Sequence, residues 1–269
     1  LFVLVQRARN AAGQVAMLDL DLFTIPSFRN GNIAAAIVSL GEFGLLFALP
    51  LWFQNVLGYS AFQTGVLLLA LATGSFVASG LGAAIGRHRS PIFLVRLGII
   101  LEIIGIAGIA VLLRPDSSWY VTAPLLFVYG IGVGFATAQL TGVVLAEVPV
   151  ERSGQGSGTQ STARQIGSAF GIAVLGTVLF SVLGAQFDAS LVETGMPEQT
   201  RTQLVAAVKD SAGAVIPSLA ADPSTAAIAD DAKQALTDAT RVSAATAAAF
   251  LLLGLAATLS LGERRRRQD

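Results

Sequence analysis

Six long stretches of mostly apolar residues follow one another along this chain, separated by polar connections, of which only the last, 184–241, is long. A helix rises about 1.5 Å per residue, so about 20 apolar residues cross the hydrocarbon core of a bilayer. The stretches are residues 32–53, 64–84, 92–113, 121–145, 161–183 and 242–261. Because each is long enough to cross as a helix, the pattern predicts an all-α membrane protein with a bundle of six transmembrane helices.

The basic residues gather on alternate connections. Arginines precede the first stretch, separate the second from the third and the fourth from the fifth, and follow the last: Arg7, Arg9, Arg29, Arg87, Arg89, Arg152, Arg264, Arg265, Arg266 and Arg267. The connection between the third and fourth stretches holds only Arg114, and that between the first and second holds no basic residue. Lysine and arginine accumulate on the cytoplasmic side of membrane proteins. This pattern therefore predicts that both ends of the chain lie in the cytoplasm.

The stretches divide the chain into segments. Residues 1–5 are apolar and lack an initiator methionine, so we expect residues 1–31 to be the end of a truncated preceding helix followed by a cytoplasmic linker. Five transmembrane helices are expected within residues 32–183, an extracytoplasmic loop at 184–240, the last transmembrane helix at 241–262 and a cytoplasmic basic tail at 263–269.

The expected loop is polar, rich in alanine and acidic. Asp222 before Pro223 is typical of an N-cap followed by proline in the first turn, and Ile228, Ala232 and Leu236 recur every four residues. We therefore expect a helix that starts near Pro223 and continues into the last transmembrane stretch. The segment is interpreted either as a solvated loop cap or as a gate or docking element.

Two glutamates, Glu42 and Glu102, lie about midway along the first and third stretches. A charged side chain at the centre of a bilayer costs about 3 kcal/mol on insertion scales, so each must face protein, water or a partner. One interpretation is a proton or cation site, and the other is a neutral carboxyl group that hydrogen bonds between helices. Arg164 and Gln165 open the fifth stretch and are expected close to the cytoplasmic interface.

Small residues predict where helices approach one another closely, because glycines at four-residue spacing let helix backbones approach in lipid. We expect this helix-packing role for Gly74, Gly82 and Gly86 on the second stretch and for Gly167 and Gly171 on the fifth.

Signals of enzymatic chemistry are absent from the sequence. The composition is 54% hydrophobic and 13% charged, with no net charge, no cysteine and one histidine. These values exclude thiolate metal sites and give no basic patch for nucleic acid. The sequence also lacks the G-x-S-x-G, H-E-x-x-H and phosphate-loop motifs. We therefore expect no enzyme, no cofactor, no bound metal and no nucleic-acid partner.

Three segments together resemble the 14-helix drug:proton antiporters of the major facilitator superfamily. The first is Leu18-Asp19-Leu20-Asp21-Leu22-Phe23 followed by Pro26-Ser27-Phe28-Arg29. The second is Trp52-Phe53-Gln54-Asn55-Val56-Leu57-Gly58-Tyr59-Ser60-Ala61-Phe62-Gln63-Thr64-Gly65. The third is Gly154-Gln155-Gly156-Ser157-Gly158, leading to Arg164-Gln165-Ile166-Gly167-Ser168-Ala169-Phe170-Gly171-Ile172-Ala173-Val174-Leu175-Gly176. In this resemblance the chain corresponds to helices nine to fourteen.

The resemblance implies the C-terminal half of a facilitator fold, whose partners are the missing N-terminal half, the lipid bilayer, protons and a small-molecule substrate. It implies proton-coupled efflux of hydrophobic or cationic molecules by alternating access, in a bacterial-type cytoplasmic (inner) membrane. By this analogy the first and fourth spans line the central cavity, which favours Glu42 over Glu102 as the proton or cation site. Candidates for the cavity wall are Phe47, Tyr129, Phe135 and Gln139.

Two other functions stay open at this point. One is export of an endogenous metabolite or lipid, which uses the same fold. The other is a non-transporting membrane scaffold or sensor that acts through its outer loop. A channel is disfavoured, because the sequence shows no ring of like charges and no repeated filter.

Overall fold

The computed structural model describes residues 19–259, with the exception of the Ala83 side chain. These residues form helices and turns: η1 (Leu20–Thr24), α2 (Pro26–Asn55), α3 (Ala61–Ile85), α4 (Pro91–Leu112), α5 (Trp119–Leu145), η2 (Val150–Arg152), α6 (Ser153–Glu193), α7 (Glu198–Asp210), α8 (Ile216–Ala221) and α9 (Ala226–Leu259). Six of them, α2 to α6 and α9, are long and apolar enough to cross a membrane. The predicted all-α bundle of six transmembrane helices is confirmed. The apolar residues 1–5 and the arginine-rich tail lie outside the described residues.

Local sequence sets where several helices begin. The side chain of Ser60 accepts a hydrogen bond from the Gln63 N–H, and the Gln63 side chain accepts one from the Ser60 N–H, which together cap α3. Ser90 caps α4 in a similar way, with Pro91 in the first turn. The short connection before α3 turns at Gly58, whose φ of +70° favours glycine. These signals make the connections tight, so consecutive helices run antiparallel.

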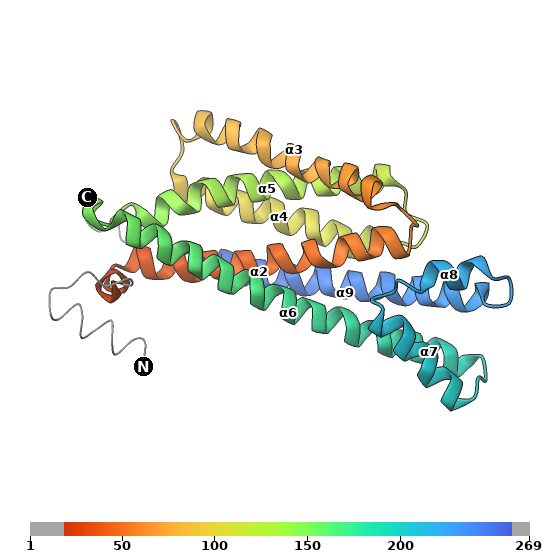
Figure 1. Cartoon of the computed structure of the whole chain (residues 1–269). Coiled ribbons are helices and arrows are strands. Elements are labelled where there is room, and N and C mark those ends of the chain that lie inside the picture. Colours follow the sequence, from red (N-terminus) through yellow and green to blue (C-terminus); the bar gives the residue numbers. More distant parts are fainter. Residues whose placement is uncertain (1–18, 260–269) are drawn as a thin grey trace.

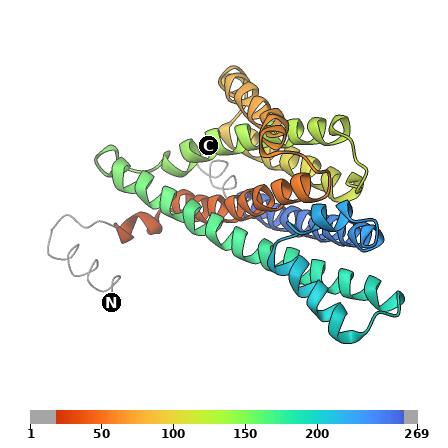
Figure 2. The ribbon, with the colours of Figure 1, turned by 45° about the vertical axis from the view of Figure 1, so that its right-hand side comes forward.

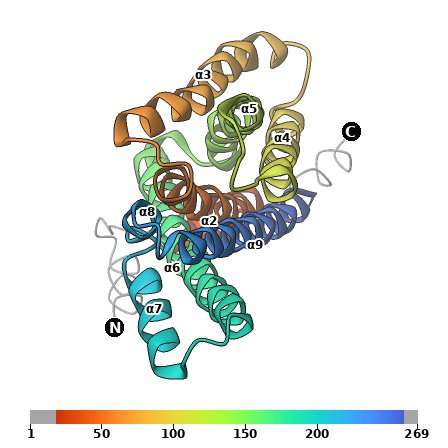
Figure 3. The same ribbon diagram turned by 90° about the vertical axis from the view of Figure 1, so that its right-hand side faces the viewer.

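The six long helices pack as two triplets (Figure 3). One triplet is α2, α6 and α9, and the other is α3, α4 and α5. The triplets meet mainly along α4 and α9 and along α2 and α5. We call this boundary the seam. It matters for function because buried polar residues from both triplets meet there.

The two ends of the bundle differ in chemistry (Figure 1). The connections α3–α4 and α5–α6, which hold Arg87, Arg89 and Arg152, lie at one end, here called the basic end. The helices α7 and α8 cover the other end, here called the cap end. Figure 2 shows α7 beside the extended end of α6, so the cap is packed on the bundle.

The segment expected as a loop, 184–240, is mostly helical. Helix α6 continues to Glu193 and α9 begins at Ala226, running unbroken into the last transmembrane stretch. The helix expected to start near Pro223 is therefore confirmed, with its first residue at Ala226. The Asp222 carboxylate accepts hydrogen bonds from Ser224 N–H at 2.9 Å and Ser224 Oγ at 2.8 Å, which lowers the pKa of Asp222. Asp222 thus stabilises the preceding turn instead of capping α9.

The cap is held by specific contacts with the transmembrane helices. The Asn55 side chain at the end of α2 donates to the Ala212 carbonyl at 3.0 Å, and Arg201 of α7 pairs with Asp188 of α6 at 2.8 Å. Ala212 has a φ of +53°, a left-handed conformation that costs free energy in a residue other than glycine. Its carbonyl is nonetheless held against α2, so the turn between α7 and α8 is fixed to the bundle.

The buried Trp52 provides a test of this packing. Its indole N–H donates to Thr237 Oγ1 at 2.9 Å, which joins α2 to α9. We expect Trp52→Phe to destabilise the bundle by about 1–3 kcal/mol, because a buried hydrogen bond and ring volume are lost. Trp119 is 62% exposed, so Trp119→Phe is the matched control. Denaturant melts of the full-length protein in detergent measure both; equal stability of the two variants would contradict this packing.

Candidate functional site

Glu42 lies midway along α2 and faces a small cavity between three helices. Its exposed fraction is 6%. The cavity is lined by Ala35, Val38, Ser39 and Glu42 of α2, Ala136, Thr137 and Leu140 of α5, and Gln160 and Arg164 of α6. Its volume is about 10 Å³, close to the least that holds one water molecule. The cavity therefore crosses the seam, with α2 and α6 on one side and α5 on the other.

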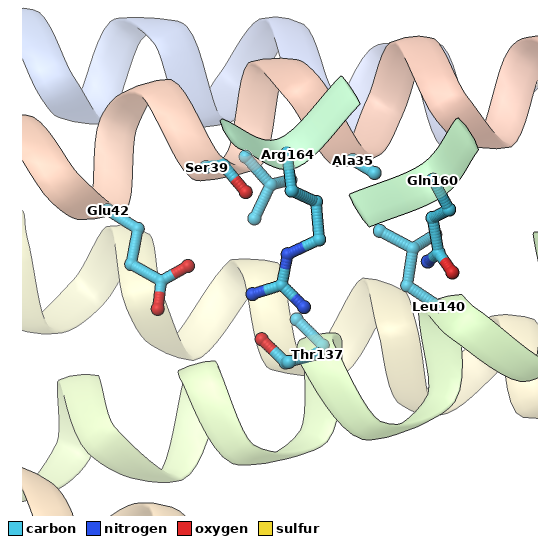
Figure 4. A pocket seen from close by; sticks show the side chains of 9 residues that line it. Ala35, Ser39, Glu42, Thr137, Leu140, Gln160 and Arg164 are labelled. Carbon is cyan, nitrogen blue, oxygen red and sulfur yellow. The ribbon is translucent and has the colours of Figure 1, made fainter. Parts of the chain in front are cut away.

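Arg164 brings a positive charge into the same cavity. Figure 4 shows its guanidinium extending from α6 beside Thr137, in the space that the Glu42 carboxyl enters from α2. The two groups interact electrostatically. No ion pair joins them among the residues that the structure describes. The hydroxyls of Ser39 and Thr137 complete a polar lining that could hold a proton, a water molecule or a small cation.

Gln160 lies one helical turn before Arg164 on α6 and closes the cavity toward the basic end. Its side-chain nitrogen donates to Thr141 Oγ1 of α5 at 3.1 Å. This hydrogen bond crosses the seam, and it keeps α6 and α5 in contact beside the cavity.

Glu102 lies on α4 and does not line this cavity. Its exposed fraction is 0%, and neither carboxyl oxygen has a hydrogen-bond partner among the residues that the structure describes. It fits against α5 because Gly132 has no side chain: a Cβ there would lie 2.7 Å from Glu102 Cγ. Glu102 interacts electrostatically with Glu42 and with Arg164. The structure thus brings the two predicted glutamates into one electrostatic neighbourhood, whereas the family analogy separates them.

Tyr129 of α5 contacts the backbone of Glu42. It is fully buried, and its hydroxyl donates to the backbone carbonyl oxygen of Glu42 at 3.2 Å. It interacts electrostatically with both carboxyl groups. We call Glu42, Glu102, Tyr129 and Arg164 the polar cluster; its members come from α2, α4, α5 and α6.

The other three candidates for the cavity wall lie elsewhere. Phe47 packs edge-on against Phe180 of α6, with ring centroids 6.3 Å apart. Phe135 is buried in a separate cluster with Ala78 and Leu94. Gln139 points at α3, where its amide nitrogen would lie 3.4 Å from a Cβ on Gly82. In the part of the chain that the structure describes, neither these three residues nor Tyr129 line the cavity beside Glu42.

Sequence reasoning missed Arg164 as a member of the site. The sequence suggested a helix start near residue 161, but α6 begins at Ser153, which places Arg164 about three turns inside it. The available signal was the spacing of Gln160 and Arg164, because residues four apart share one face of a helix. A glutamine and an arginine on one face indicate a polar lining.

Three of the five helix-packing glycines, Gly74, Gly167 and Gly171, lie where helices nearly touch. A Cβ on Gly74 would collide with the backbone of α5 at Phe127, and one on Gly167 or Gly171 would collide with the backbone of α2 at Ala36 or Leu40. Space at Gly82 is ordinary, with the nearest atom 3.4 Å away. Gly86 ends α3, its N–H bonded to the Gly82 carbonyl at 2.9 Å. These contacts fix the register of α2 with α6, and hence the position of Glu42 relative to Arg164.

Comparison with known proteins gives consistent matches. The family model for the Major Facilitator Superfamily matches residues 5–172. The chain is 30% identical over 195 residues to the multidrug resistance protein Stp of Mycobacterium tuberculosis, covering 71% of this chain and 35% of that protein. It is 28% identical over 250 residues to the multidrug efflux pump LfrA of Mycolicibacterium smegmatis, covering 93% and 48%.

A further relative is the tetracenomycin C resistance and export protein of Streptomyces glaucescens, at 26% identity, covering 78% of this chain and 39% of that protein. Among solved structures, a bacterial homologue of the human lysosomal transporter Spinster, inward-facing and unoccupied, superposes with a TM-score of 0.59 at 18% identity, covering 90% of this chain and 50% of that one. The chain spans half or less of the length of each of these proteins. The fold and the matches together show that this chain belongs to the Major Facilitator Superfamily, a family of membrane transporters.

Proposed function

We propose that this chain is the C-terminal half of a secondary transporter that exports hydrophobic or cationic small molecules in exchange for protons. Its membership of a transporter family and its similarity to proteins named for multidrug resistance and export support this proposal. The observation that carries it is the buried Glu42 carboxyl, which shares a polar cavity with Arg164 at the seam of the bundle.

In an antiporter, proton binding must weaken substrate binding, and substrate binding must weaken proton binding. A carboxylate at Glu42 attracts the Arg164 guanidinium and any cationic substrate, and proton binding removes that attraction. A proton that moves down about 100 mV releases roughly 2.3 kcal/mol, enough to shift a two-state equilibrium almost fiftyfold. Protonation of Glu42 is in this proposal the event that biases the two halves toward one face of the membrane.

The basic end is proposed to face the cytoplasm of a bacterial-type inner membrane, with the cap end outside. Two single-cysteine variants test this in a full-length, otherwise cysteine-free background: Gln199→Cys in α7 and Val150→Cys at the basic end. A membrane-impermeant thiol reagent added to intact cells is expected to label Gln199→Cys and to leave Val150→Cys unlabelled. Labelling of the Val150 position alone would contradict the orientation.

Transport by the full-length protein in proteoliposomes tests the function itself. The fluorescent cation ethidium serves as the probe. We expect an imposed pH gradient to drive ethidium transport, and we expect a protonophore to abolish it. Ethidium movement that is the same with and without the gradient would overturn proton coupling, and a fall only when ATP is removed would point to another energy source.

A further inference from the structure

Glu102 is a buried acidic group to which the proposed cycle gives no task. It is fully buried, and within residues 19–259 both of its carboxyl oxygens lack hydrogen-bond partners. An ionised carboxylate so placed is strongly disfavoured, and even the neutral acid leaves a donor and an acceptor unpaired. An apolar side chain of similar length would avoid these costs. The packing of α4 against α5 at Gly132 therefore does not account for a carboxyl group here.

Three charged or titratable groups from the surrounding helices interact electrostatically with Glu102. They are Glu42 from α2, Arg164 from α6 and Tyr129 from α5. On its own helix, Arg96 is engaged elsewhere, donating to the Thr258 carbonyl of α9 at 2.9 Å. Helix α9 contributes Arg241, which donates to the Ala110 carbonyl at 2.8 Å, about two turns from Glu102 along α4. Glu102 is thus electrostatically connected to the Glu42 site.

The four residues of the polar cluster lie on both sides of the seam. Glu42 and Arg164 belong to one helix triplet, and Glu102 and Tyr129 belong to the other. The Tyr129 hydroxyl already bridges to the Glu42 backbone across this boundary. The Glu42 and Glu102 carboxyl groups interact electrostatically across this boundary. A proton bound on one side of the seam therefore changes the free energy of binding a proton on the other.

Resting on the proposed function, we infer that Glu102 is a second proton-binding carboxyl, which the transporter loads and unloads together with Glu42. A hydronium ion gives a proton to the Glu42 carboxylate: one O–H bond of the hydronium ion breaks, an O–H bond forms on Glu42, and a water molecule is left. That bond then breaks as an O–H bond forms on the Glu102 carboxylate, and a second proton refills Glu42. No oxidation or reduction takes place. This half of the transporter then carries two exchangeable protons in each cycle, and release reverses the same steps.

Proton counting on the purified full-length protein tests this inference. The protons released on ethidium binding are measured in weakly buffered detergent solution with a pH dye. Glu102→Gln, which keeps the size of the side chain, is expected to release about one proton fewer than the wild type. The control Glu193→Gln, at the exposed end of α6, is expected to release as many as the wild type. An unchanged count for Glu102→Gln would overturn the inference.

Infrared difference spectra between acidic and alkaline solutions provide a readout that needs no substrate. We expect the wild type to lose a protonated-carboxyl band on alkalinisation that Glu102→Gln lacks. A Glu102 band that persists at every pH at which the protein stays folded would show a fixed structural proton and overturn the inference. If the wild type releases no proton on binding ethidium, the proposed function fails as well; if only the Glu102→Gln comparison fails, proton coupling through Glu42 stands.

Discussion

Glu42→Gln is expected to lower ethidium transport driven by a pH gradient by at least about tenfold, equivalent to 1.4 kcal/mol. Glutamine keeps the shape of the side chain, but its amide group does not bind or release a proton as a carboxyl group does. The cavity would keep its polar lining. Arg164 would no longer face a carboxylate whose charge changes during the cycle. Initial rates in proteoliposomes of the full-length protein, at equal protein content, measure this effect.

The control for this variant is again Glu193→Gln, which removes an exposed carboxylate from the same protein. It is expected to transport at the wild-type rate. Ethidium binding by Glu42→Gln, measured by fluorescence polarisation, distinguishes lost coupling from lost binding or folding. Wild-type transport by Glu42→Gln under the same gradient would sink the role assigned to this carboxyl.

Gly130→Ala is expected to destabilise the bundle strongly, by about 1–3 kcal/mol or more, because a methyl group cannot be accommodated without separating two helices. A Cβ on Gly130 would overlap the Leu71 carbonyl oxygen of α3, and a backbone atom cannot rotate away as a side chain can. The expected result is a lower midpoint of denaturation for the full-length protein in detergent.

Gly142 on the same helix provides the matched control. A Cβ there meets no atom within 4 Å, so Gly142→Ala is expected to be neutral or to stabilise the helix by up to about 1 kcal/mol. A Gly130→Ala variant as stable as Gly142→Ala would show that α3 and α5 do not approach as closely as described.

The fold could be predicted from the sequence because lipid imposes a simple rule. Stretches of about 20 apolar residues with tight turns between them leave few alternatives to a helix bundle. The helix ends were less predictable. The polar and glycine-rich start of α6, Gly154-Gln155-Gly156-Ser157-Gly158, gives no apolar signal, although the structure makes it helical. The helix expected near Pro223 starts at Ala226, but Asp222, expected as its N-cap, accepts a hydrogen bond from Ser224 in the turn before it.

The candidate site was predictable in kind but not in membership. The position of Glu42 and Glu102 within apolar stretches was enough to single them out. Helices that are apolar on nearly all faces do not show which face meets which neighbour. The pairing of Arg164 with the Glu42 cavity, and the turning of Gln139 toward α3, depend on glycine contacts between helices that only three-dimensional packing reveals.

Proton movement driven by an ethidium gradient tests the central claim most directly, namely that the Glu42 cavity exchanges protons for substrate. Proteoliposomes of the full-length protein, with a pH dye inside, receive ethidium on one side without an imposed pH gradient. The account predicts protons moving against the flow of ethidium in the wild type, and no proton movement in Glu42→Gln vesicles that still bind ethidium. Equal proton movement in the wild type and in Glu42→Gln would contradict it.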